Sequence, residues 1–186
     1  MSHIRFHLPS APDYTIIDSL HDSVRFARHC LVDFNGHLAQ AATFVDPEGA
    51  PMLWHDFGVL EGPGWASNAI GGAHMLFQYG RFMGRESIQQ EALKVLDHVL
   101  YDGFIDDDTG FISGYRHIPD NRICLNYKSR DDWFCVGSMA RMADQLLRFS
   151  VDLQSYSKVN LPDHEKRVTY MRHAALACSQ WIIEHA

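Results

Sequence analysis

The chain has 186 residues, of which 46% are hydrophobic and 21% are charged, and its formal net charge is -7. This length is typical of one domain and suffices to bury roughly two-thirds of the surface that the unfolded chain exposes. The acidic balance and the scattered Lys and Arg residues argue against a nucleic-acid partner, because phosphate binding requires clustered positive charge. No stretch approaches the roughly 20 consecutive apolar residues of a membrane span, so we expect no membrane partner.

The first residues of the chain bear on its compartment, and the spacing of cysteine and histidine bears on metal binding. Residues 1–10 contain neither a basic segment followed by an apolar run nor a small-residue cleavage site, so we expect a cytoplasmic protein. The four cysteines show no C-x-x-C spacing, and three of them lie in apolar surroundings typical of buried thiols. The 12 histidines form neither an HxH nor an HExxH pattern. We therefore expect no bound metal and no cofactor.

The spacing of apolar residues predicts a succession of helices. They are expected at residues 18–33, 65–83, 86–101, 133–153 and 165–184. The first, third and fifth have one apolar face, whereas the second and fourth are apolar nearly all round, which is typical of buried helices. Gly71 and Gly72 lie inside the second helix and cost about 1 kcal/mol each in helix propensity, so we expect a close helix contact or a ligand beside them.

The segments between these helices contain turn residues and short β-like runs. Residues 34–63 hold too many Gly and Pro residues for a helix, although residues 43–45 and 52–54 are typical of short strands. Residues 111–115 and 122–127 flank Pro119, Asp120 and Asn121, which predicts a β-hairpin. Long loops therefore precede each buried helix. This alternation predicts an all-α fold of repeated helical hairpins, with residues 1–186 forming a single domain.

Two short segments carry a resemblance to a known superfamily. Residues 61–65 (EGPGW) and 129–134 (SRDDWF) each precede a predicted inner helix. Together with the alternation of helices, they resemble the six-hairpin (α/α)-toroid glycosidases, which include unsaturated glucuronyl and rhamnogalacturonyl hydrolases and, more distantly, sugar epimerases. A complete ring has more than twice as many helices as this sequence predicts. The chain then corresponds to a partial toroid, either a fragment of a larger (α/α)6 ring or a ring completed by another subunit.

The resemblance implies a carbohydrate-active protein, and a glycoside hydrolase needs a carboxyl group as general acid. Asp131 and Asp132 precede one inner helix, and we expect one of them to be the acid. Asp56 and Glu61 precede the other inner helix and would supply its partner. Each of these carboxylates has a simpler interpretation as a helix cap or as a solvated loop charge.

Aromatic residues beside these carboxylates are candidates for binding a saccharide. Sugar rings stack on aromatic faces, and the residues expected to bind the substrate are Trp54, His55, Trp65, Tyr115 and Trp133. Core packing is the alternative for each Trp, because a buried indole removes a large apolar area from water. Arg116 and Arg122, on the predicted hairpin, could bind an acidic sugar or could be ordinary surface charges.

Other functions remain open from the sequence. The first is a noncatalytic helical-repeat module that binds a glycan or a protein, or that self-associates as a homo-oligomer, because an open toroid leaves apolar helix edges uncovered. A weaker alternative is a zinc-dependent cyclase that resembles the lanthionine synthetase toroids, with Cys124, Cys135 and a His as ligands. The run from Asp106 to Gly110 offers calcium ligands but lacks the downstream Glu of an EF-hand loop.

Overall fold

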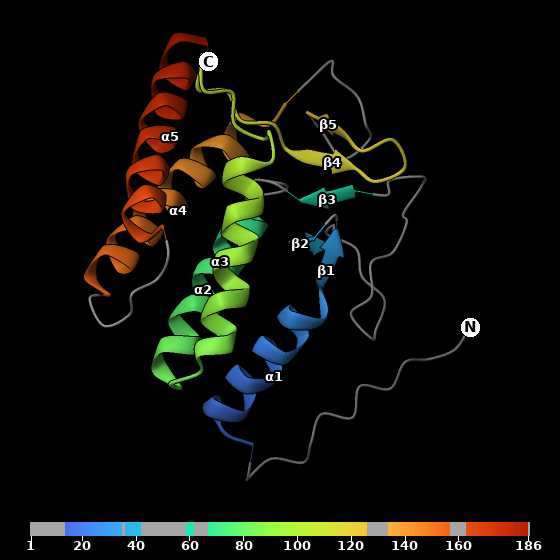
Figure 1. Ribbon diagram of the computed structural model, residues 1–186, viewed down its shortest axis with the longest axis vertical. Coiled ribbons are helices and arrows are strands. Elements are labelled where there is room, and N and C mark those ends of the chain that lie inside the picture. Colours follow the sequence, from blue (N-terminus) through green and yellow to red (C-terminus); the bar gives the residue numbers. More distant parts are fainter. Residues whose placement is uncertain are drawn as a thin grey trace.

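The computed structural model describes residues 14–34, 36–41, 59–61, 67–125, 134–156 and 163–185. Within these residues the chain forms five helices and one antiparallel sheet of five strands (Figure 1). The helices are α1 (Ile16–His29), α2 (Asn68–Phe82), α3 (Glu86–Tyr101), α4 (Val136–Ser155) and α5 (His164–His185). The strands are β1 (Leu31–Phe34), β2 (His37–Ala41), β3 (Val59–Glu61), β4 (Tyr115–His117) and β5 (Arg122–Cys124). The predicted helix-rich class is confirmed, and the sheet is larger than the single predicted hairpin.

The first predicted helix is shorter in the structure than the sequence pattern indicated. It begins at a capping box, in which the Thr15 hydroxyl accepts from the Asp18 N–H and the Asp18 carboxylate accepts from the Thr15 N–H. It ends at His29, and the next residues form β1, which pairs with β2 through the register Phe34↔His37. Gly36 has φ 83°, a left-handed conformation that glycine adopts without strain. The prediction of helix through residue 33 was therefore wrong.

Helices α2 to α5 form two hairpins that lie side by side. The α2–α3 connection is a tight turn in which Gly84 has φ 62° and the Arg85 N–H donates to the Gly80 carbonyl. Helices α4 and α5 pack together as the second hairpin, and α2 contacts α4 across the junction. Phe77 and Phe149 meet there with ring centroids 5.3 Å apart. The buried apolar side chains of all five helices belong to one hydrophobic cluster.

The sheet lies against the helical hairpins through β2. Its strands follow chain order from β1 to β5, and β2 packs on α3 and contacts α2. The predicted hairpin corresponds to β4 and β5, which pair through Tyr115↔Cys124. β4 begins at Tyr115, where the predicted strand was expected to end, and β5 ends at Cys124, earlier than expected. The expected strands at residues 43–45 and 52–54 lie outside the described residues. The sheet therefore places β2, and with it His37, beside the C-terminal end of α3 (Figure 1).

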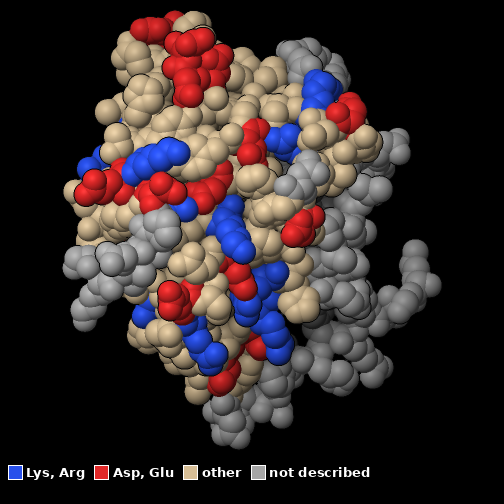
Figure 2. All heavy atoms as spheres, viewed as in Figure 1, with Lys and Arg blue, Asp and Glu red and all other residues tan. Residues whose placement is uncertain are grey.

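Charged side chains of both signs are interspersed over the face shown in Figure 2. Two bidentate ion pairs hold elements together at or near the surface: Arg28 with Glu91, joining α1 to α3, and Arg167 with Asp97, joining α5 to α3. All four of these hydrogen bonds are 2.6 Å long. Among the described residues, no helix has the length and apolar character needed to cross a membrane.

The α2–α3 turn provides a test of the packing. A Cβ added at Gly80 would lie 2.8 Å from Gln89 Cγ and 3.0 Å from both the Arg85 carbonyl oxygen and the Gln89 backbone nitrogen. Gly80→Ala should therefore destabilise the protein by about 1–3 kcal/mol through overpacking, although Ala is the better helix former. Gly72→Ala is the control, because its nearest described atom would be Gln40 Oε1 at 3.7 Å. Urea unfolding measures the stability of both variants, and equal unfolding midpoints would contradict the described packing.

Candidate functional site

Most of the residues predicted to form the site lie outside the described part of the chain. These are Trp54, His55, Asp56, Trp65, Asp131, Asp132 and Trp133. The structure does place the other two candidates together, because Glu61 in β3 pairs with Tyr115 in β4. Tyr115 is buried, with 4% of its surface exposed, so a stacking role would require its ring to be uncovered.

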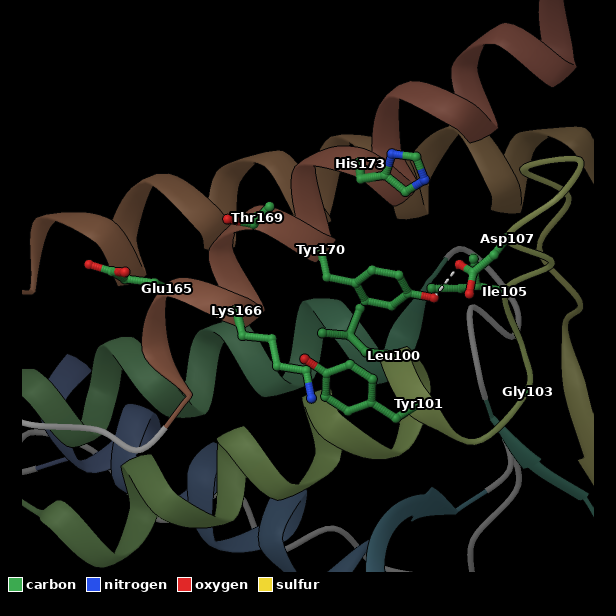
Figure 3. A pocket seen from close by; sticks show the side chains of 10 residues that line it. All are labelled: Leu100, Tyr101, Gly103, Ile105, Asp107, Glu165, Lys166, Thr169, Tyr170 and His173. Carbon is green, nitrogen blue, oxygen red and sulfur yellow. Dashed lines mark hydrogen bonds between the residues drawn. The ribbon is translucent and has the colours of Figure 1, made fainter.

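An open groove lies between the C-terminal end of α3 and the first half of α5 (Figure 3). Its volume is about 660 Å³, within the range of small-molecule sites. The α3 end and the following loop supply one wall, and α5 supplies the other. The lining residues are Leu100, Tyr101, Gly103, Ile105, Asp107, Glu165, Lys166, Thr169, Tyr170 and His173.

Aromatic rings form the floor of this groove. Tyr101 from α3 stacks on Tyr170 from α5, with ring centroids 5.5 Å apart and an interplanar angle of 17°. The Lys166 ammonium lies 5.0 Å from the centre of the Tyr101 ring, a cation–π contact. His173 stacks more loosely on Tyr170, at 6.5 Å. Tyr101 is 41% exposed, so the groove presents an aromatic surface to solvent between positive and negative side chains.

Neighbouring carboxylates in the Asp-rich turn before the β-hairpin have different hydrogen-bond partners. Asp106 accepts from the Asp108 and Thr109 N–H groups, and hydrogen bonds with Thr109 and Asp108 lower the pKa of Asp106. Asp107 instead accepts from the Tyr170 hydroxyl at 2.5 Å, inside the groove (Figure 3). Burial raises the pKa of Tyr170, and the bond to Asp107 raises it further. Asp107 is thus a groove residue that the sequence suggested only as a possible calcium ligand.

Two glycines position the walls of the groove. Gly103 has φ 89° directly after the C-cap of α3, which redirects the chain at the helix end. Gly110 has φ 79°, and an added Cβ there would lie 2.5 Å from the backbone carbonyl of Ala177 in α5. The turn that carries Asp107 is therefore held directly against α5. Neither role was evident in the sequence, because both depend on which helix lies opposite.

A second polar cluster lies where β2 meets the end of α3. His98 Nδ1 is 2.6 Å from Asp102 Oδ2, and His37 Nδ1 is 3.5 Å from the same oxygen. Burial lowers the pKa of His98, although the contact with Asp102 acts in the opposite direction. Among the described residues, this is the one group of three or more His, Cys, Asp or Glu side chains arranged so that they could hold a metal ion.

The cysteine ligands suggested for a zinc cyclase do not belong to that group. Cys124 lies buried in β5, and its thiol donates to the Tyr115 carbonyl, whereas Cys135 is exposed at the N-cap of α4. Cys30 and Cys178 are buried, which agrees with the expectation of three buried thiols. Burial raises the pKa of Cys178 to about 11, so this thiol stays protonated and unreactive near neutrality.

The two arginines suggested for acidic-sugar binding have structural partners. Arg116 is 9% exposed, and its Nη2 donates to the main-chain carbonyl of Asp102 at 2.6 Å. Its Nη1 donates to the Asn121 side chain at 2.7 Å. Arg122 lies within 3.8 Å of Asp120. Arg116 therefore caps the end of α3, where a cation is favoured by the helix dipole.

A third His–Asp contact joins the two hairpins. His74 Nε2 in α2 lies 2.7 Å from Asp152 Oδ2 in α4, and Gln78 donates to the same oxygen at 2.6 Å. The His74 ring also stacks on Phe149, at 4.8 Å. Burial alone would raise the pKa of Asp152, but the bonds from His74 and Gln78 outweigh it, and the pKa is lowered. This contact couples α2 to α4.

None of the known protein families, curated proteins or solved structures compared with this chain matches it. Function must therefore be inferred from the geometry of these three sites. Of these three sites, the groove combines a volume of about 660 Å³ with an exposed aromatic side chain.

The Tyr170–Asp107 contact can be tested through its titration. Asp107→Asn removes the negative charge beside the phenol, so the pKa of Tyr170 should fall but stay above its ordinary value, because burial remains. The wild-type free energy of unfolding should decrease as pH rises above about 10, since the unfolded phenol ionises first. That decrease should be smaller in the variant. Carbon-13 shifts of labelled tyrosine measure the pKa directly.

Asp108→Asn is the matched control, because it removes the same charge from the same turn. It should leave the titration of Tyr170 almost unchanged, since Asp107 is the carboxylate that bonds this phenol. An equal fall in the pKa of Tyr170 in the two variants would mean that the turn acts on this phenol only through its net charge.

Proposed function

We propose that the chain is a carbohydrate-binding protein built as part of an (α/α) toroid, with a saccharide site in the groove between α3 and α5. The observation that carries the proposal is the aromatic floor formed by the exposed Tyr101 and the partly buried Tyr170, flanked by Asp107 and Lys166. A sugar ring has an apolar face that packs on an aromatic ring and hydroxyl groups that bond to charged side chains. The groove offers both kinds of partner within about 660 Å³.

The arrangement of the hairpins supports the toroid part of the proposal. In a ring of stacked helical hairpins, the inner helices of successive hairpins touch, and each outer helix packs on its own inner helix. Helices α2 and α4 have the contact expected of inner helices, and α3 and α5 would be their outer partners. The two hairpins thus correspond to one segment of a ring, which a second copy or further chain would complete.

The binding proposal is tested by presenting the protein to an array of oligosaccharides and measuring affinity for those retained. Tyr101→Ala removes an exposed part of the floor and should weaken binding by about tenfold or more, equivalent to roughly 1.4 kcal/mol. Phe82→Ala is the control, because Phe82 is an aromatic residue with 72% exposure that does not line the groove. Equal affinity in wild type and Tyr101→Ala would refute the groove as the saccharide site.

Glycoside hydrolysis is the second candidate function. The register that pairs Glu61 with Tyr115 favours it, because β3 and β4 bring two of the predicted site residues to neighbouring positions in the sheet. In this proposal Asp132 or Asp131 is the general acid, and Glu61 or Asp56 is its partner. The acid would donate a proton to the departing oxygen while its partner activates water or stabilises positive charge.

A double substitution separates binding from catalysis. Asp131→Asn with Asp132→Asn should lower any hydrolysis of a retained oligosaccharide by at least about 100-fold, the usual contribution of a general acid. Saccharide affinity in the α3–α5 groove should stay the same. Asp144→Asn is the control, because Asp144 is a partly exposed carboxylate of α4 paired with Arg148. Hydrolysis that survives the double substitution would exclude both residues as the acid.

A further inference from the structure

We infer that His37, His98 and Asp102 form a binding site for a divalent first-row transition metal, with Zn²⁺ as the expected ion. The three side chains can each offer one ligand atom, and these atoms all lie within 4.8 Å of one another. Two imidazoles and one carboxylate are a ligand set that suits Zn²⁺, which takes three protein ligands and leaves one position open in many sites. This site is separate from the groove and does not depend on the proposed function.

The ligands come from two elements whose positions are fixed independently. His98 and Asp102 are one helical turn apart at the C-terminal end of α3, so they lie on the same face of the helix. The Asp102 N–H donates to the His98 carbonyl at 3.2 Å, which holds the turn. His37 begins β2, and its ring centroid lies 6.0 Å from that of His98. An ion here would join the sheet to the helix.

The Asp102 carboxylate contacts both histidines, and Arg116 attracts it through its charge. Its Oδ2 lies 2.6 Å from His98 Nδ1 and 3.5 Å from His37 Nδ1. Arg116 donates instead to the main-chain oxygen of Asp102, at 2.6 Å. At 2.6 Å the contact between Asp102 and His98 is a hydrogen bond, so a bound ion would take the place of its proton and the two ligand atoms would move apart.

A second observation concerns the interior of the cluster. His98 is 1% exposed, and within the described part of the chain its Nε2 has no hydrogen-bond partner. Nε2 is the ring nitrogen remote from Asp102, so an ion held beside the Asp102 carboxylate would be coordinated by Nδ1 and would leave Nε2 without a partner. The side chains of His37 and Asp102 are 45% and 22% exposed, so an ion can enter from solvent.

Zinc binding to the whole chain tests the inference, measured by competition with a chromophoric chelator. We expect one Zn²⁺ per chain at this site. His37→Ala and Asp102→Asn should each weaken binding by about tenfold or more, because each removes a ligand. Both positions are partly exposed, so these variants should fold, and circular dichroism verifies this. His98→Ala is avoided because it would leave a cavity in the core.

The control is needed because the chain contains 12 histidines. His117 lies 2.7 Å from Asp120 and forms a His–Asp pair that has no third ligand among the described residues, so His117→Ala should leave zinc affinity unchanged. Nitrogen-15 spectra of the imidazoles should show that Zn²⁺ shifts His37 and His98 first. Wild-type zinc affinity in both His37→Ala and Asp102→Asn, or the absence of zinc binding by the wild-type chain, would overturn the inference.

Discussion

The contact between α2 and α4 is the constraint on which the rest of the structure depends. Phe77 and Phe149 pack across it, and His74 both stacks on Phe149 and bonds to Asp152. Because α3 and α5 each fold back on one of these helices, the α2–α4 contact also sets the distance between α3 and α5. Tyr101 and Tyr170 can stack across that distance, which creates the groove.

The helices could be predicted because their signals are local. The predicted third helix, residues 86–101, coincides with α3, since its apolar stripe is regular and a glycine turn precedes it. The first helix was predicted too long because Leu31 and Phe34 fit a helical spacing as well as a strand. The Asn35-Gly36 pair, a strong hairpin signal, would have indicated the strands on either side.

The candidate sites could be predicted only in small part, because they depend on contacts between residues distant in sequence. His37 and His98 show no motif, and Asp107 is distinguished from Asp106 only by the tyrosine of α5 that lies opposite it. The sequence likewise predicted a close contact at Gly71 and Gly72, but it could not show which glycine of the helix has close neighbours in the fold. The glycine with the tightest surroundings in α2 is Gly80, because the turn into α3 folds back over it.

The C-terminal end of α3 links the groove to the histidine cluster. Tyr101 contributes to the floor of the groove, and Asp102, the next residue, contacts His98 and His37. Arg116 caps the same turn through the Asp102 carbonyl, so the backbone between the two sites is held by a charged hydrogen bond. A movement of this helix end would carry both residues with it. The groove and the histidine cluster therefore share the backbone of one helix end, although each takes a different side chain from it.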